Sequence, residues 1–516
     1  MSMTYGFFIR ANAEKHPDRP ALIWEDEVFT YRDLHTRSNQ LANALGRLGI
    51  RKGDKVSLYM TNCVEYIEAI FALAKIGAVF VPIGYRLVAK EMKFIVDHSE
   101  SVALIFTGDL ADQVQEVRRE LAGVSRGRCI LVGSPRDADL VSYETLLQSG
   151  DPSDPDVEVN EEDEFYIAYT SGTTGFPKGA VFTQRARMIA LLQMAIEFGI
   201  DSRDITLTSG PLYHAAPCFI SLLHLFLGTQ VVLMKQFDPV EQLRNIQKYK
   251  ITNVFMVPTM YNMILNLPEE EKRAYEVSSV RVLLSAAAPL PTKTKESILE
   301  FFPQGGLFEF YGFTEVGLAT VLRPEDQLRK TRCVGLPTYF LDLRILDGNG
   351  KEVPQGKEGL IYVKCSYLMK EYFKNPKATQ AAFHGNWLTA QDIGTVDEEG
   401  YLYVVDRKAD MVISGGVNIY PVEIDDVLQR HPKVLEAAVI GVPDAKWGET
   451  LLAFIVPRPG MEVTADEIME FCEGKLAKFK VPRAINLVAE LPKSPAGKVL
   501  KRILREPYWK GQEARV

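Results

Sequence analysis

A ten-residue loop rich in glycine and hydroxyl groups constrains the fold of this chain more than any other segment. Residues 170–179 read Thr-Ser-Gly-Thr-Thr-Gly-Phe-Pro-Lys-Gly. Aromatic and β-branched residues at 165–169 predict a short buried strand before the loop, and residues 180–182 predict a second strand after it. Because glycine has no Cβ and tolerates positive φ, a loop of this kind lets backbone N–H groups approach an anion closely.

The side chains of this loop predict that the anion is a polyphosphate, since they combine hydroxyl donors with the positive charge of Lys178. A flexible polar surface loop is the plain alternative. The Walker A loop is excluded, because that motif needs Ser or Thr after its Gly-Lys pair, whereas Pro177 precedes this lysine and Gly179 follows it. The sequence therefore predicts a nucleotide loop of another type. Its expected binding residues are Thr170, Ser171, Gly172, Thr173, Thr174, Gly175 and Lys178.

Size, charge and cysteine content narrow the class of protein. A chain of 516 residues is too long for one hydrophobic core, so we expect at least two domains. A formal net charge of −8 argues against a general nucleic-acid binder, whose affinity would rest on a basic surface. The six cysteines stand far apart, so we expect free thiols in a reducing cytoplasm. The N-terminus does not resemble a secretory signal, and no apolar run reaches the roughly 18 residues that span a bilayer.

Helix and strand patterns alternate over most of the chain. Thr30 and Asp33 form a capping-box pattern that predicts the start of a helix, and residues 55–59 then predict a strand. The same alternation runs on through residues 205–257. It predicts parallel sheets with helices on their faces, and hence an α/β fold with two α/β subdomains.

The pattern changes near residue 325. Short strands with Gly and Asp turns predict a small antiparallel barrel or sheet, and we expect the β-barrel, at about 325–405, as the last part of an N-terminal domain at 1–405. The charged residues 406–410 predict a linker. Residues 411–516 predict a compact α+β C-terminal domain.

Two loops that follow predicted strands have side chains suited to a ligand, because an α/β sheet binds ligands where its strands end. His214 lies between prolines and small residues after the strand at 205–209, although a histidine that hydrogen-bonds locally is an equal alternative. Residues 286–288 are three alanines after the strand at 282–284, and they leave room for a flat group against the backbone.

Two further segments offer groups for a nucleotide. Tyr311 follows the strand at 307–310 and presents a face for stacking a purine, while Thr314 and Glu315 suit phosphate and Mg²⁺. A capped turn with a core tyrosine is the alternative. Asp392 lies between two short strands, where its carboxylate suits the hydroxyls of a ribose, although a lone Asp in a turn is more often structural.

Taken in order, these pieces resemble the acyl-adenylate-forming superfamily, which includes acyl-CoA synthetases, firefly-type luciferases and the adenylation domains of peptide synthetases. The phosphate loop, the stretch at 311–315, Asp392, Arg407 and Lys498 stand at separations similar to those of the family. The resemblance covers essentially the whole chain and implies that the C-terminal domain is a mobile lid. One departure is Gln391, where the family usually has glycine.

The resemblance implies a two-step reaction that uses ATP, Mg²⁺ and coenzyme A. A carboxylate first attacks the α-phosphorus of ATP, giving an acyl-adenylate and pyrophosphate. Two anions meet in this step, and Lys498 matches the lysine that supplies positive charge there. The residues implied as catalytic are Lys498, Thr314, Glu315 and His214, with Glu315 also holding Mg²⁺. Those implied at the nucleotide, besides the phosphate loop, are Ala287, Glu309, Tyr311, Gly312, Asp392 and Arg407.

The second implied step follows rotation of the lid about residues 406–410, after which the CoA thiol takes the acyl group. Ser414, Gly415 and Gly416 would line the tunnel for the pantetheine arm. Ala409 stands where the family's hinge residue is usually Asp or Lys. Further CoA contacts, by resemblance to some relatives, are Trp447, Phe479, Lys480 and Arg483.

The acid is expected to be a medium-chain fatty, alicyclic or aromatic monocarboxylic acid. No carboxylate occurs at 212–217 to hold an α-amino group, and no Arg or Lys lines the expected pocket to pair with a second carboxylate. An enzyme that loads a carrier protein, or a non-catalytic binding module, is the alternative; a homodimer is expected by analogy only. The expected pocket residues are His214, Cys218, Val257, Thr259, Ala286, Ala288, Gly312, Phe313 and Val316.

Overall fold

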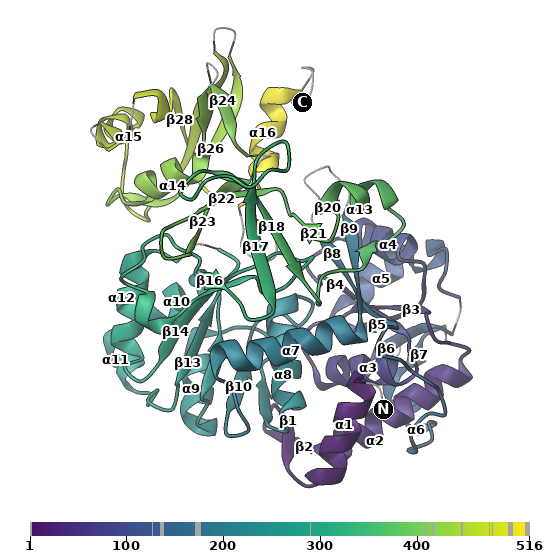
Figure 1. The fold of residues 1–516 in the computed structure, drawn as a ribbon. Helices are drawn as coiled ribbons and strands as arrows, with labels where there is room; N and C mark the ends of the chain where they lie inside the picture. The colour runs from purple at the N-terminus through teal and green to yellow at the C-terminus, as the bar shows by residue number, and fades with distance from the viewer. Residues whose placement is uncertain are drawn as a thin grey trace. The chain divides into compact units, whose positions relative to one another are not determined.

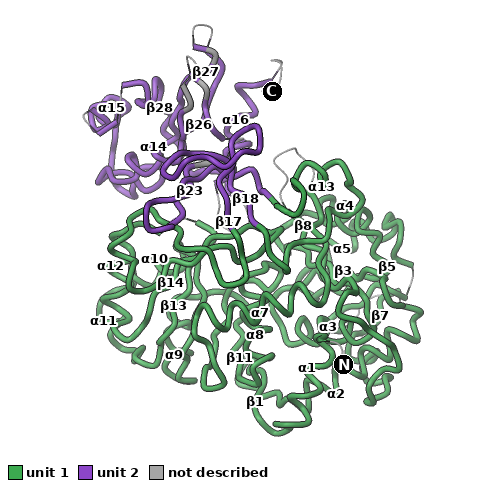
Figure 2. Tube along the Cα trace, viewed as in Figure 1, with its two compact units in different colours: residues 1–342, 364–388 green, residues 343–363, 389–516 purple. Residues whose placement is uncertain are grey.

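The chain forms two compact units (Figure 2). Unit 1 comprises residues 1–342 and 364–388, and unit 2 comprises residues 343–363 and 389–516. Within the described ranges, no helix has the length and apolarity needed to cross a membrane. The computed structural model describes residues 3–125, 127–134, 139–170, 177–288, 290–407, 410–414, 417–444, 447–473, 475–476, 478–493 and 499–510.

The first sheet of unit 1 has eight strands, in the order β19-β9-β8-β4-β3-β5-β6-β7. Strands β3 to β8 run parallel to their neighbours, whereas β9 is antiparallel to both β8 and β19. Alternate residues of β4, such as Val79 and Val81, face an apolar core that helices α4 (Ala89–His98) and α5 (Ala111–Val117) complete. The strands are β3 (Lys55–Tyr59), β4 (Val79–Ile83), β5 (Ser101–Thr107), β6 (Cys129–Val132), β7 (Val141–Ser142), β8 (Glu164–Thr170), β9 (Lys178–Thr183) and β19 (Glu371–Tyr372).

The second sheet of unit 1 has nine strands, in the order β16-β15-β14-β13-β12-β10-β11-β1-β2. The hairpin β1–β2 comes from the N-terminal segment, and β1 pairs with β11 at Leu22↔Val231. The central strands β10 to β14 run parallel to one another. The strands are β1 (Pro20–Trp24), β2 (Glu27–Thr30), β10 (Ile205–Thr208), β11 (Gln230–Leu233), β12 (Asn253–Phe255), β13 (Val282–Ser285), β14 (Gly306–Tyr311), β15 (Thr320–Leu322) and β16 (Leu336–Pro337).

The helices of unit 1 cover both sheets, which confirms the predicted α/β class. Figure 1 shows α7 and α8 between the two sheets, where α7 packs on β8 and β9 and α8 packs on β10 and β11. The predicted capping box is present at α2, because Thr30 Oγ1 accepts from the Asp33 N–H and Asp33 accepts from the Thr30 N–H. The helices are α1 (Tyr5–Lys15), α2 (Tyr31–Arg47), α3 (Val64–Lys75), α4 (Ala89–His98), α5 (Ala111–Val117), α6 (Tyr143–Gln148), α7 (Gln184–Phe198), α8 (Ala215–Phe226), α9 (Pro239–Tyr249), α10 (Pro258–Leu265), α11 (Glu269–Arg273), α12 (Thr292–Phe301) and α13 (Pro376–Ala382).

The strands expected to form a small barrel form an open antiparallel sheet instead. Strand β17 (Leu341–Leu346) pairs with β18 (Gly359–Cys365), which pairs with β22 (Asp392–Val396), which pairs with β23 (Leu402–Arg407). Among the described strands, β23 does not return to pair with β17, so the expected barrel is corrected to a sheet. A short hairpin, β20 (Phe383–His384) and β21 (Trp387–Leu388), belongs to unit 1.

The C-terminal part of unit 2 is α+β, as expected. Its long hairpin, β26 (Val434–Asp444) with β27 (Gly448–Pro457), sends alternate residues to opposite faces. Val439 and Ala453 lie on the face covered by α14 (Pro421–Gln429) and α15 (Ala465–Cys472), whereas Ile440 and Leu452 share a core with α16 (Lys501–Trp509). The sheet is completed by β24 (Val412–Ser414), β25 (Val417–Ile419) and β28 (Ala484–Leu487).

Candidate active site

The carboxyl ends of β13 and β14 bring two predicted segments together. The two strands are parallel neighbours, and Ser285 pairs with Glu309 at this edge. The alanines at 286–288 therefore begin beside the stretch that starts at Tyr311. Ala287 has a φ of +73°, which is rare for a residue with a Cβ and stores about 1–3 kcal/mol of strain. Strained backbone of this kind concentrates at binding sites.

A buried ion pair lies beneath this edge. Lys295 of α12 donates from Nζ to Glu309 Oε1 at 3.0 Å, and the exposed fractions of the two residues are only 2% and 7%. Burial raises the pKa of Glu309, and the Lys295 ammonium opposes that rise. Glu309 Oε2 and the Ser285 hydroxyl have no hydrogen-bond partner among the described residues. Two buried polar atoms without partners fit a ligand that donates hydrogen bonds there, as the amino group of adenine does.

Glu315 offers a buried carboxylate in the loop after β14. Its side chain accepts a hydrogen bond from the Tyr372 hydroxyl, and its backbone carbonyl accepts from the Met369 N–H at 2.8 Å. Burial, and then the Glu315 carboxylate, raise the pKa of Tyr372 well above its usual value. The described residues contain no cluster of three His, Cys, Asp or Glu side chains that could hold a metal. A single carboxylate nevertheless fits Mg²⁺, which commonly binds one or two protein carboxylates together with substrate phosphates.

The two ends of the predicted phosphate loop lie on neighbouring strands. Thr170 ends β8 and pairs with Lys178, which begins β9. The Lys178 ammonium lies 5.4 Å from the centre of the Tyr372 ring, so the loop lysine and Glu315 share one neighbour. A Cβ on Gly179 would lie 2.8 Å from the Ile167 side chain, which explains the glycine there. Ser171, Gly172, Thr173, Thr174 and Gly175 lie outside the described residues.

His214 is the N-cap of α8 and is half-buried, with its shielded Nε2 lacking a partner among the described residues. Burial lowers the pKa of His214 to about 4, with a smaller contribution from Arg86. Asn62 holds the loop before it: the Asn62 amide group donates to Gly210 O at 2.9 Å and accepts from the Leu212 N–H at 2.8 Å. Asn62 was not among the predicted residues, because its partners lie about 150 positions away in the chain.

The other predicted pocket residues belong to unit 1 but differ in exposure. Cys218, Ala286 and Val316 are buried, whereas Thr259 and Ala288 are exposed. Val257, Phe313 and Thr314 are half-buried and Gly312 is exposed. Tyr311 is half-buried, with its ring centre 6.2 Å from that of Phe313.

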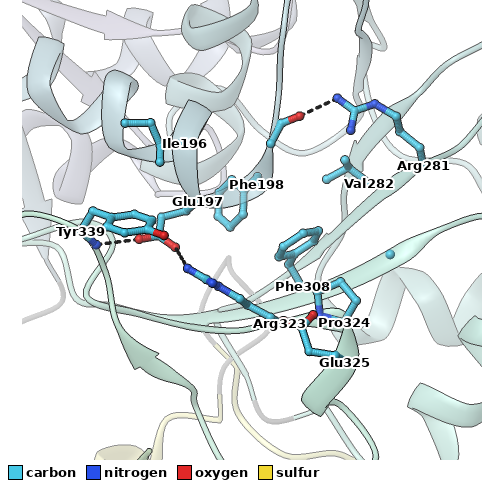
Figure 3. Close-up of a pocket in the computed structure, with 12 residues that line it drawn as sticks. Ile196, Glu197, Phe198, Arg281, Val282, Phe308, Arg323, Pro324, Glu325 and Tyr339 are labelled. Atoms are coloured by element: carbon cyan, nitrogen blue, oxygen red, sulfur yellow. Dashed lines mark hydrogen bonds and ion pairs between the residues drawn. The ribbon is translucent and has the colours of Figure 1, made fainter. Parts of the chain in front are cut away.

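A cavity of about 430 Å³ lies at the amino ends of strands β13 and β14, opposite to their carboxyl ends (Figure 3). It is lined by the C-terminal end of α7 and by the first residues of β13 and β14, away from the strand ends that carry the predicted residues. Its cations are already paired: Arg323 with Glu197 at 3.2 Å, and Arg281 with the Gly199 carbonyl at 2.7 Å. The cavity is therefore distinct from the candidate site.

Unit 2 carries the predicted ribose residues. Asp392 is buried at the start of β22, and its backbone pairs with Arg407 of β23, whose side chain lies outside the described part. Gln391 has a φ of +66°, a conformation that favours glycine, the residue that the resemblance led us to expect there. The Gln391 N–H donates to Thr389 Oγ1 at 3.0 Å and helps to hold the turn.

The predicted CoA contacts include two exposed aromatic rings, each beside a cation that also has a carboxylate partner. Lys480 is half-buried and donates to Glu423, and Arg483 lies 3.6 Å from Asp444. The Arg483 guanidinium lies 5.3 Å from the centre of the Trp447 ring, and Lys480 lies 5.8 Å from that of Phe479. Ser414 pairs with Gly448 at the edge of β27. Gly415, Gly416, Ala409 and Lys498 lie outside the described residues.

Comparison with known proteins defines the class. Residues 9–373 match the AMP-binding enzyme family, and residues 423–498 match the AMP-binding enzyme C-terminal domain. The chain therefore belongs to the AMP-binding enzyme family, which confirms the resemblance to acyl-adenylate-forming enzymes.

Three relatives illustrate the similarity. The chain is 34% identical over 512 residues to a long-chain-fatty-acid–CoA ligase of Mycobacterium tuberculosis, covering 98% of both chains. It is 35% identical over 501 residues to a feruloyl-CoA synthase of an Amycolatopsis species, covering 96% of this chain and 97% of the relative. The structure of o-succinylbenzoate CoA synthetase from Bacillus subtilis, in complex with its acyl-adenylate intermediate, matches with a TM-score of 0.85 at 29% identity, covering 98% of both.

Proposed function

We propose that this protein is an ATP-dependent, AMP-forming carboxylic acid–CoA ligase. The observation that carries the proposal is the pairing of a buried carboxylate, Glu315, with the phosphate-loop lysine, Lys178, through the side chain of Tyr372. A carboxylate for a divalent cation and a lysine for a phosphate, held by one neighbour, match the needs of Mg²⁺-ATP. The named activities of the relatives, all acid–CoA ligases, support the same assignment.

In the first step the residues of unit 1 would bind and orient ATP. Bound Mg²⁺, held by Glu315, would neutralise charge on the phosphates. Thr170 to Lys178 would hold the β- and γ-phosphates, with Thr314 beside them. Tyr311 would stack on adenine, with Ala287, Gly312 and Glu309 around the base. The partnerless Oε2 of Glu309 suits the adenine amino group.

Residues of unit 2 would complete the nucleotide site. Asp392 and Arg407 would bind the ribose, and their neighbouring positions on β22 and β23 support a joint role. Lys498 would bring positive charge to the carboxylate and the α-phosphate as they meet.

The second step would transfer the acyl group to the CoA thiol after rotation of a C-terminal domain, residues 411–516, about a linker at 406–410. Ser414, Gly415 and Gly416 would line the path of the pantetheine arm. The exposed rings of Trp447 and Phe479 would offer stacking faces for the CoA nucleotide, with Arg483 and Lys480 beside them.

The acid would be a medium-chain fatty, alicyclic or aromatic monocarboxylic acid. The relatives act on acids as different as a long-chain fatty acid and ferulate, so their names do not choose among these classes. Partly buried apolar residues such as Val257 and Phe313 support an apolar substrate. His214, neutral at physiological pH because its pKa is about 4, would act as a pocket wall or gate.

AMP formation from ATP and Mg²⁺ tests the proposal across a panel of acids, each with and without CoA. The panel runs from acetate to palmitate and includes benzoate, cyclohexanecarboxylate and ferulate. We expect CoA-dependent AMP with one class of acid. Adenylate without CoA-dependent turnover would favour loading of a carrier protein, and no AMP with any acid would contradict the ligase assignment.

Lys498→Ala separates the two steps. The variant should lose adenylation while still converting a preformed acyl-adenylate to thioester, because Lys498 acts only in the first step. Lys493→Ala is the matched control, since Lys493 lies in the same segment but forms an ion pair with Glu436. Equal loss of both steps in Lys498→Ala would contradict the division of roles.

We also propose a cytoplasmic location, which the six free thiols support. Homodimer formation stays a prediction from analogy, and light scattering of the purified chain checks it.

A further inference from the structure

Residues 367–373, which we call the bracing segment, run antiparallel to the strand that leaves the phosphate loop. The Phe373 N–H donates to the Gly179 carbonyl and the Lys370 N–H donates to the Val181 carbonyl, both at 2.7 Å. These bonds fix β19 to β9, beginning at Gly179, the second residue of β9. The bracing segment is therefore tied to the backbone that carries Lys178.

The same segment is tied to the loop that carries Glu315. The Met369 N–H donates to the Glu315 carbonyl at 2.8 Å. Arg187, buried on α7, donates from one nitrogen to the Tyr367 carbonyl at 2.8 Å and to the Val316 carbonyl at 3.3 Å. The backbone carbonyls of Glu315 and of the next residue, Val316, are therefore held to the bracing segment, the second through Arg187.

Tyr372 is the side chain at which these two attachments meet. Its hydroxyl donates to Glu315, and its ring face lies 5.4 Å from the Lys178 ammonium. The backbone of Tyr372 pairs with Ala180 on β9, so the ring projects from β19, the strand beside the one that begins at Lys178. One side chain thus contacts both an expected phosphate-binding cation and an expected Mg²⁺-binding carboxylate.

We propose that Tyr372 is a positioning residue that aims the Glu315 carboxylate for Mg²⁺ and keeps Lys178 from pairing with it directly. The proposal rests on the function proposed above. The hydroxyl uses one oxygen of Glu315 and leaves the other for the cation. The ring attracts the ammonium by its π face without adding negative charge, so the charge of Lys178 stays directed at phosphate.

The hydroxyl and the ring have separable effects. Tyr372→Phe keeps the ring beside Lys178 and removes the bond to Glu315. Tyr372→Leu removes both, and a direct Lys178–Glu315 ion pair then becomes possible. We therefore expect the first variant to lose Mg²⁺-dependent binding alone, and the second to lose phosphate binding as well.

Calorimetric titration with α,β-methylene-ATP, in excess Mg²⁺ and in EDTA, measures these effects without turnover. For Tyr372→Phe we expect affinity in Mg²⁺ to fall about 10–100-fold, as for other groups that orient a metal ligand, with affinity in EDTA unchanged. For Tyr372→Leu we expect weaker binding in both conditions. Mn²⁺ binding to the nucleotide complex, followed by electron paramagnetic resonance, should weaken in both variants.

Tyr143→Phe is the matched control, because the buried Tyr143 hydroxyl also donates to a buried carboxylate, Glu68, at 2.8 Å. This variant should lose stability but keep nucleotide affinity in both conditions. Three results would overturn the proposal: Mg²⁺-dependent affinity of Tyr372→Phe within twofold of the original, equal weakening with and without Mg²⁺ in that variant, or the same loss in Tyr143→Phe.

Failure of this inference is distinguishable from failure of the proposed function. An unaltered protein that forms acyl-CoA, together with an unaffected Tyr372→Phe, would leave the ligase assignment standing and remove the role of Tyr372. If the unaltered chain forms no AMP with any acid, yet Tyr372→Phe loses Mg²⁺-dependent nucleotide binding, the role of Tyr372 would stand and the ligase assignment would fall.

Discussion

The Lys295→Met variant tests whether the buried Glu309 carries a charge at the edge of the second sheet. Lys295 Nζ lies 3.0 Å from Glu309 Oε1, and both side chains are almost fully buried. Methionine fills a similar volume with no charge. The variant therefore leaves Glu309 in the same apolar surroundings without its cation.

The expected loss is large for a single substitution. Removing one partner of a buried ion pair destabilises a protein by about 3–5 kcal/mol, because the other charge is left unpaired. At roughly 2.1 cal/mol/K per residue, unit 1 unfolds with an entropy of roughly 0.8 kcal/mol/K, so Tm should fall by about 4–6 °C if it unfolds in one step.

Thermal unfolding of the full chain at pH 8 and at pH 5 measures the effect and its sign. Burial already raises the pKa of Glu309, and loss of the Lys295 ammonium raises that pKa further. A raised pKa means that the folded state gains stability as the carboxyl takes a proton, and loses it as pH rises through the folded-state pKa. The fall in Tm should therefore be greatest at pH 8 and smaller at pH 5.

Lys293→Met is the control on the same helix, because Lys293 is exposed. The double variant Lys295→Met/Glu309→Leu should regain most of the lost Tm, since apolar replacement of a buried pair is often neutral. It should not regain affinity for ATP if Glu309 contacts adenine. An unchanged Tm in Lys295→Met, or an equal fall at both pH values, would refute the reasoning.

Three further predictions concern the buried residues Asn62 and His224 and the exposed turn residue Gln391. Asn62→Ala should raise KM for the acid on the order of tenfold and leave KM for ATP unchanged, because the loop before His214 loses its two hydrogen bonds with Asn62. An equal rise in both KM values would contradict this. Burial lowers the pKa of His224 to about 4. The contribution of the neutral imidazole to stability is therefore present above pH 6.5 and is lost as pH falls toward 4. His224→Gln should flatten the fall in Tm between pH 7 and pH 5. An unaltered slope would argue that His224 is not the group responsible. Gln391→Gly should raise Tm slightly or leave it unchanged, with KM for ATP preserved, because φ is +66° there, and a clear loss of stability would count against strain at Gln391.

Much of the fold could be predicted from local sequence patterns. The capping box at Thr30, the strand at 55–59 and the alternation on the β26–β27 hairpin depend on neighbouring residues, which a sequence displays directly. In a parallel sheet the carboxyl ends of all strands lie on the same side, so the alanines at 286–288 and Tyr311 could be placed on one side of the sheet. The expected barrel was wrong because closure depends on pairing between distant strands, and local patterning does not encode it.

The unpredicted neighbours of the site are joined to it by long-range contacts. Tyr372 reaches Glu315 from 57 positions away, and Asn62 reaches Gly210 from 148 positions away. Lys295 lies only 14 positions from Glu309, yet the pairing requires a helix to fold back over the sheet. A tyrosine in a short strand, or a lysine on a helix, carries no local mark of such a role.

The N-terminal hairpin has a consequence for how the chain is made. Strand β1 finds its parallel partner, β11, only when Val231 has been synthesised, long after Leu22. A ribosome that adds about 5–20 residues per second needs roughly 10–40 s to cover that interval. Throughout this time Ala21, Leu22 and Ile23, which end up buried, are paired at most with β2. The nascent chain therefore exposes an apolar strand edge, to which chaperones can bind, until β1 pairs with β11 in the second sheet.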